Sequence, residues 1–163
     1  SKGLLGIGGR LGQDRAPFYG SDPYEATRID SFLDVSLNFA VESQKYLFAF
    51  GNLDRLGQAH VDMASAYETY MRGMDRALSN QKYVAGDDIS LADIAFACEF
   101  ALFALERHEG NKLSKVDCEP LFDTVATDCK HAHKHLEFLY SQPAFLPDVT
   151  PYFHDMTMKK AFG

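Results

Sequence analysis

The chain has 163 residues and a mass of 18.2 kDa, which suits one domain with its own core. Its 23 acidic residues outnumber its 16 lysines and arginines, and the net charge is −7. This balance argues against a nucleic-acid-binding protein and against binding to an anionic membrane surface. Three widely spaced cysteines favour a reducing, cytoplasmic location, and no apolar run reaches the ~20 residues of a membrane span.

The first half of the chain predicts a leading segment and two long helices. Residues 1–21 are glycine-rich and indicate a linker or an N-terminal tail, so that residues 22–163 form the domain. Asp22 is a suitable N-cap and Pro23 a suitable first-turn residue for a helix that ends near Gly51. Apolar residues at steps of three and four predict a second helix over about 57–79.

The stretch from Tyr83 to Ile94 carries the most specific local signal. Ser90 is a typical N-cap, and Asp93 stands where its carboxylate can return a hydrogen bond to the Ser90 backbone, which makes a capping box. Ile89 and Ile94 stand where they can form a hydrophobic staple around the cap. The helix that follows, to about residue 107, is apolar on nearly every side, so we expect it to run through the middle of a bundle.

The last third of the chain predicts a fourth helix over about 118–140 and a short one within 151–161. No segment alternates convincingly enough to predict a strand. The predicted fold class is therefore all-α, a bundle of about five to six helices.

Three stretches resemble the C-terminal, all-helical domain of the glutathione transferase superfamily. Residues 86–95 resemble the capping box and staple at the start of that domain's central helix. Residues 19–34 resemble its linker and first helix, and residues 142–145 the turn after its fourth long helix. Together the resemblance spans about residues 10–148.

The resemblance implies a function that needs a second domain. Members of the family carry a thioredoxin-like domain that supplies the thiol-activating residue, and none of it is present in this chain. We therefore expect no catalytic residue here and no activity from the chain alone. Joined to such a domain, it would help to conjugate or reduce small apolar electrophiles with glutathione as co-substrate, as a homodimer.

Two other functions stay open. Transferase-like helical domains also occur as non-catalytic interaction modules, in the gamma subunit of translation elongation factor 1B and in synthetase-associated scaffolds. A more remote alternative is a free-standing bundle that stores or senses a small apolar ligand.

The resemblance also points to candidate substrate-binding residues on the first helix, whose early turns face the glutathione cleft in the family. Arg28, Asp34 and Asn38 are the polar candidates, and Tyr46 is a candidate for the apolar substrate wall. The alternative for each polar residue is an ordinary solvated or interhelical contact.

Histidines and cysteines provide no site of their own. His131 and His135 share a helix face while His133 points elsewhere, so three ligands do not converge and no metal site is predicted. We expect all three to be solvated on the outside of the fourth helix. Cys98 lies on the apolar helix and is expected to be a buried, unreactive thiol.

Overall fold

The computed structural model describes residues 18–154, with the side chains of residues 153 and 154 left out. Within that range the regular elements are all helical, so the predicted fold class is confirmed. An isolated antiparallel bridge joins Tyr83 to Gly86 in the loop before the central helix. No helix in this range combines the length and the apolar character that crossing a membrane requires.

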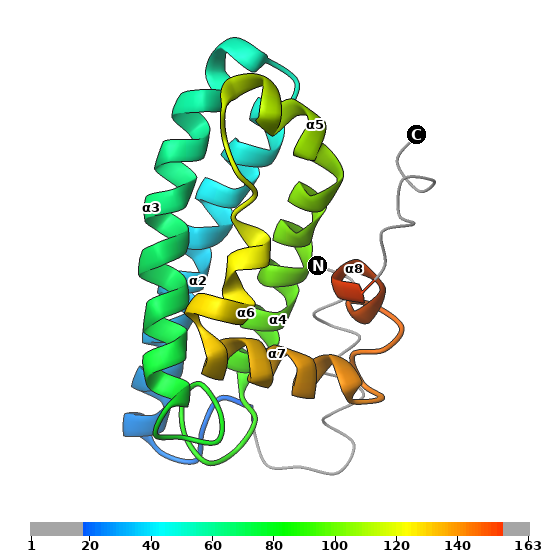
Figure 1. The fold of residues 1–163 in the computed structure, drawn as a ribbon. Helices are drawn as coiled ribbons and strands as arrows, with labels where there is room; N and C mark the ends of the chain where they lie inside the picture. Colours follow the sequence, from blue (N-terminus) through cyan, green and yellow to red (C-terminus); the bar gives the residue numbers. More distant parts are fainter. Residues whose placement is uncertain (1–17, 155–163) are drawn as a thin grey trace.

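Two long antiparallel helices, α2 (Pro23–Ala49) and α3 (Leu53–Leu78), lie side by side along the bundle (Figure 1). Asp22 caps α2 by accepting hydrogen bonds from the backbone N–H groups of Tyr24 and Glu25. Helix α3 begins about four residues earlier than predicted because Asn52 accepts the N–H of Asp54 and serves as its N-cap.

Helix α4 (Leu91–Phe103) is central, as predicted, and continues into η1 (Ala104–Glu109). Phe96, Phe100 and Phe103 are fully buried. The rings of Phe96 and Phe103 meet aromatic rings of α2 and α3, and the ring of Phe100 stacks on Phe122. One side of the helix, at residues 95, 98, 99 and 102, is only half-buried. The aromatic residues therefore form the core where α2, α3 and α4 meet.

The prediction of one continuous helix over about 118–140 is wrong, because the structure divides this region into several shorter helices. Two short elements precede this region, α5 (Gly110–Leu113) and η2 (Ser114–Val116). Two more lie within it, η3 (Phe122–Thr124) and α6 (Val125–Asp128). Helix α7 (Lys130–Ser141) follows a break at Cys129, and α8 (Thr150–His154) ends the described chain. Figure 1 shows α7 running from beside the lower part of α3 across the lower part of α4 toward α8.

Carboxylates from distant elements explain this break. Glu106 accepts the N–H groups of Leu121 and Phe122, and so holds the start of η3. Asp75 on α3 accepts the N–H groups of His131 and Ala132, and so caps the start of α7. Each carboxylate satisfies donors that a continuous helix would have satisfied internally, so two helix starts replace one long helix.

Candidate functional site

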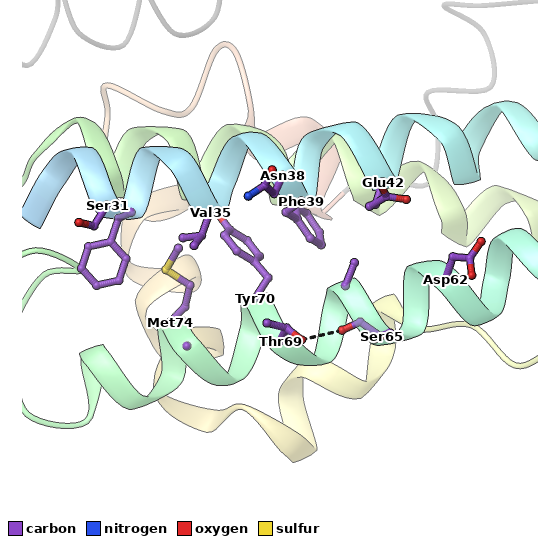
Figure 2. Close-up of a pocket in the computed structure, with 13 residues that line it drawn as sticks. Ser31, Val35, Asn38, Phe39, Glu42, Asp62, Ser65, Thr69, Tyr70 and Met74 are labelled. Atoms are coloured by element: carbon purple, nitrogen blue, oxygen red, sulfur yellow. Dashed lines mark hydrogen bonds between the residues drawn. The ribbon is translucent and has the colours of Figure 1, made fainter.

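A groove of about 670 Å³ lies between α2 and α3 and is the candidate ligand site (Figure 2). Both helices contribute facing side chains along its length, so the antiparallel pairing of the two helices creates it. The lining residues are Ser31, Phe32, Val35, Asn38, Phe39 and Glu42 on α2, and Asp62, Ser65, Ala66, Thr69, Tyr70, Gly73 and Met74 on α3.

The floor of the groove is apolar and rigidly packed. The rings of Phe39 and Tyr70 stack with their centroids 4.3 Å apart. The Tyr70 hydroxyl lies 2.8 Å from the hydroxyl of buried Ser36, which fixes the tilt of the ring. Met74, on the next turn of α3, continues the apolar surface. This floor suits a flat or aliphatic group that is itself poorly hydrated.

The rim of the groove is polar and carries two acids near one end. Figure 2 shows Glu42 on α2 and Asp62 on α3 at the same end, with Asn38 next along α2. Glu42 accepts a 2.7 Å hydrogen bond from Lys45, and Asp62 accepts one of 2.9 Å from Gln58. This end of the groove therefore favours a cationic or hydrogen-bond-donating group.

The described lining of the groove offers carboxylates, an amide, hydroxyl groups and apolar surface. It contains no cysteine, histidine or lysine that could act as nucleophile or base. Burial raises the pKa of the Tyr70 hydroxyl, so that group stays protonated at neutral pH. Among the described side chains, those of residues 18–152, no three His, Cys, Asp or Glu residues are placed to hold a metal ion.

Of the four predicted substrate-binding residues, Asn38 lines the groove. Asp34 is exposed on α2 outside its lining. The other two lie elsewhere. The Arg28 guanidinium donates a 2.8 Å hydrogen bond to Gln81 in the loop after α3. Tyr46 is buried in the core and donates a 2.7 Å hydrogen bond to Glu106, so its assignment to an open substrate wall is corrected.

Both hydrogen bonds of the capping box are present at the start of α4. The Ser90 backbone N–H donates to Asp93 at 2.9 Å, and the Ser90 hydroxyl accepts the N–H of Ala92 at 3.3 Å. Ile89 and Ile94 are both buried in the core, on either side of the cap. Asp93 also accepts the N–H of Val84, so one carboxylate fixes the loop and the helix start together.

His135 corrects the expectation of three solvated histidines. It is only 7% exposed, and its Nε2 lies 2.8 Å from an oxygen of the buried Asp93 carboxylate. His131 is exposed and His133 is half-buried, 3.8 Å from Glu137. The histidine spacing gave no sign of this contact, because Asp93 and His135 are 42 residues apart.

Glu106 is a buried polar group that the sequence reasoning missed. It is fully buried and accepts hydrogen bonds from Tyr46, Leu121 and Phe122. Burial raises the pKa of its carboxyl above the usual range. One feature of the sequence could have indicated it: Glu106 stands at the end of an almost wholly apolar helix. An acid buried at such a position needs hydrogen-bond partners.

The three cysteines are free thiols. Burial raises the pKa of Cys98 to about 12, in agreement with the expectation of an unreactive thiol, although its side chain is half-buried. Cys118 is half-buried and Cys129 is buried, and burial raises the pKa of both. None of these thiols has the lowered pKa of a nucleophile.

Comparison with known proteins agrees with this architecture. The family model for the glutathione S-transferase C-terminal domain matches residues 58–143. A crystal structure of a glutathione S-transferase from Rhodospirillum rubrum F11 superposes with a TM-score of 0.61 at 16% sequence identity. The match covers 93% of this chain but 62% of that one, so the present chain spans less than two thirds of it. No curated protein matches the chain. The family match covers more than half of the sequence, and the chain belongs to the glutathione S-transferase C-terminal domain family.

Proposed function

We propose that residues 22–163 are the substrate-side helical domain of a glutathione transferase-like enzyme. The family match supports this proposal. The composition of the groove supports a role in substrate binding rather than in thiol activation. Its lining offers apolar surface and acidic rim groups but no group that lowers a thiol pKa. The thiolate would come from a thioredoxin-like domain, and the 163-residue chain would be inactive by itself.

The groove supports a particular placement of the two substrates. The stacked Phe39 and Tyr70 would take the apolar part of a small electrophile. The end that carries Asn38, Glu42 and Asp62 would take the ammonium end of glutathione, because carboxylates accept charge-assisted hydrogen bonds from an ammonium group. The single observation that carries the proposal is this apolar floor beside an acidic rim on a family-typical helix pair.

The partner surface is the second part of the proposal. Leu37, Val41 and Phe48 are exposed on α2, and Phe48 is 81% exposed. Their spacing places them on one stripe of the helix, away from the groove. A stripe of this kind suits burial against a second copy in a homodimer or against the thioredoxin-like domain. The three free thiols support a reducing, cytoplasmic location.

The experiment measures turnover of a chromogenic chloronitrobenzene with glutathione, using the chain joined to a thioredoxin-like domain and the chain alone. We expect turnover from the joined protein only. Thr69→Trp, which fills the groove from its exposed rim, is expected to raise KM for the electrophile about tenfold. Glu68→Trp, on the neighbouring exposed position outside the groove lining, is the matched control and is expected to leave KM unchanged.

The exposed stripe also supports the alternative function, a non-catalytic interaction module of the elongation factor 1B gamma or synthetase-scaffold type. Such a module needs an apolar docking surface and no thiol activation. Failure of the joined protein to turn over any electrophile, with stable complex formation through Phe48, would select this alternative. Loss of the complex in Phe48→Ser with unchanged folding would identify the stripe as the docking surface.

A further inference from the structure

We propose that the α2–α3 groove binds arylalkylamines, molecules in which a flexible aliphatic spacer joins an aromatic ring to an ammonium group. Such an amine would occupy at once the positions assigned above to the electrophile and to the ammonium end of glutathione. The inference deepens the proposed function and rests on it for this competition with the two substrates. The groove volume of about 670 Å³ is within the ~300–1,000 Å³ that is usual for small-molecule sites.

The charged groups in the groove lining are all negative. Its described residues include no lysine, arginine or histidine, and its two carboxylates belong to Glu42 and Asp62. Glu42 forms an ion pair with Lys45 at 2.7 Å through one of its two oxygens, and the Lys45 side chain is 64% exposed. Asp62 accepts a hydrogen bond from the neutral Gln58 amide and belongs to no ion pair within the described chain. The Asp62 carboxylate is therefore open to charge-assisted hydrogen bonds from an ammonium group.

The floor of the groove favours a ligand that also carries an aromatic ring. The stacked rings of Phe39 and Tyr70 have their planes 14° apart, and Val35 and Met74 extend the apolar surface beside them (Figure 2). Gly73 leaves this part of the groove open, because a Cβ there would meet nothing within 4 Å beyond its own helix and chain neighbours. An aromatic ring would gain burial against this surface, which a small alkylammonium or inorganic cation would not.

The distance from the floor to the acids requires a spacer in the ligand. Asp62 precedes Tyr70 by eight residues on α3, which is about 12 Å along the helix axis at ~1.5 Å per residue. Glu42 follows Phe39 by three residues on α2, or about 4.5 Å. Figure 2 shows both acids at the same end of the groove, beyond the aromatic pair. An ammonium group on a chain of several methylenes can therefore reach these acids while the ring stays on the floor.

The test titrates the 163-residue chain with three fluorescent probes that share a dansyl group and a spacer. Dansylcadaverine ends in an ammonium group, N-pentyl dansylamide is neutral, and dansyl-aminocaproate ends in a carboxylate. We expect the cationic probe to bind most tightly and the anionic probe most weakly, with Kd values about tenfold apart at low salt. Equal Kd values for the three probes would overturn the proposal.

Two matched double variants separate the groove acids from the general negative charge of the chain. Glu42→Gln, Asp62→Asn is expected to raise the Kd of dansylcadaverine about tenfold and to leave that of N-pentyl dansylamide unchanged. Asp34→Asn, Glu68→Gln removes the same charge from the same two helices at exposed positions outside the lining, and is expected to leave both Kd values unchanged. An equal rise for dansylcadaverine in the two double variants would overturn the proposal, because the cation would then bind the acidic surface at large.

Energy transfer from tryptophan to the dansyl group locates the probe independently of its affinity. The chain contains no tryptophan, so one substitution supplies a single donor. Transfer to bound dansylcadaverine is expected to be more efficient in Glu68→Trp, on α3 beside the groove, than in Ser141→Trp, at the end of α7. More efficient transfer in Ser141→Trp would place the probe outside the groove and overturn the proposal.

The binding assay and the turnover assay distinguish failure of this proposal from failure of the proposed function. Charge-selective binding by the chain, without turnover by the joined protein, would support the ligand class and count against the transferase. Turnover by the joined protein without a preference for the cationic probe would overturn the ligand class alone. When both proposals hold, dansylcadaverine is expected to inhibit turnover competitively against glutathione.

Discussion

Two fully buried carboxylates lie at opposite ends of the central helical segment and differ in how the chain satisfies them. Asp93 lies in the first turn of α4, and Glu106 lies in η1 beyond its end. Asp93 accepts backbone hydrogen bonds from two residues close to it in the chain, Val84 and Ser90. Glu106 accepts the backbone N–H groups of Leu121 and Phe122, which lie 15 and 16 residues further along the chain.

A buried polar group can be recognised from the sequence only when its partners are close to it in the chain. Asp93 stands in a fixed register with its N-cap, so the motif predicts its bond to Ser90 but not its bonds to Val84 and His135. Glu106 accepts hydrogen bonds from Leu121, Phe122 and Tyr46, which no local spacing connects to it. Both carboxylates organise backbone donors in a loop, and four substitutions measure how far their contributions differ.

Asp93→Ala is expected to have the largest effect. The substitution leaves the N–H groups of Val84 and Ser90 without their acceptor and His135 without its partner. Breaking a buried pair of this kind typically costs about 3–5 kcal/mol. Urea unfolding measures the free-energy change, with Asp87→Ala, an exposed acid in the same loop, as the matched control. A free energy of unfolding in urea unchanged from that of the parent chain would contradict the capping role.

Glu106→Gln is expected to cost about 1–3 kcal/mol, since one oxygen must then accept hydrogen bonds that two shared. The effect depends on pH. Burial raises the pKa of the folded Glu106 carboxyl, so its contribution is fully present below the unfolded pKa of about 4.3 and is lost as pH rises through the folded value. The variant should therefore lose more stability at pH 4 than at pH 7. Glu119→Gln, an exposed neighbour, controls for charge, and an equal loss at both pH values would refute the assignment.

Ser90→Ala is expected to cost about 1 kcal/mol, the usual effect of removing an N-cap hydroxyl. The hydroxyl accepts from Ala92 and donates to Asp93, but the Ser90 backbone N–H keeps its own bond to Asp93. The loss should therefore be clearly smaller than for Asp93→Ala. Thermal unfolding of the two single variants side by side decides this, with the exposed Ser141→Ala as control.

Ser43→Ala is expected to have the smallest effect, within about 0.5 kcal/mol of the parent chain or slightly stabilising. The Ser43 hydroxyl is buried in α2 and has no hydrogen-bond partner among residues 18–154. Removing a buried hydroxyl that lacks a partner relieves its desolvation cost. A loss above 1 kcal/mol in urea unfolding would show that this oxygen contributes as the two carboxylates do.

The helix boundaries were predictable wherever the stop and start signals are local. Asp22 with Pro23, and Ser90 with Asp93, mark helix starts through side chains within three residues of the donors they serve. The division of the predicted helix over 118–140 was not predictable in this way. Its cause is a carboxylate on α3 and another on η1, and a continuous apolar periodicity runs across the break.

The candidate site was predictable as a region rather than as residues. The family resemblance directed attention to α2, and Asn38 does line the groove on that helix. Tyr46 shares the helix but faces the core, because its position falls on the buried side together with Phe39 and Phe50. Arg28 turns to Gln81, a residue of the loop after α3 whose position only the folded chain determines.

The three chain separations spanned by Asp93 also predict an order of events during folding. Its bonds to Ser90, Val84 and His135 close loops of 3, 9 and 42 residues. The entropic cost of closure rises with loop length, so the two short contacts can form in the transition state and the long one after it. Slower refolding is then expected from changes at Ser90, and faster unfolding from changes at His135. The Asp93 carboxylate is thus expected to take part both in contacts that form early and in one that forms late.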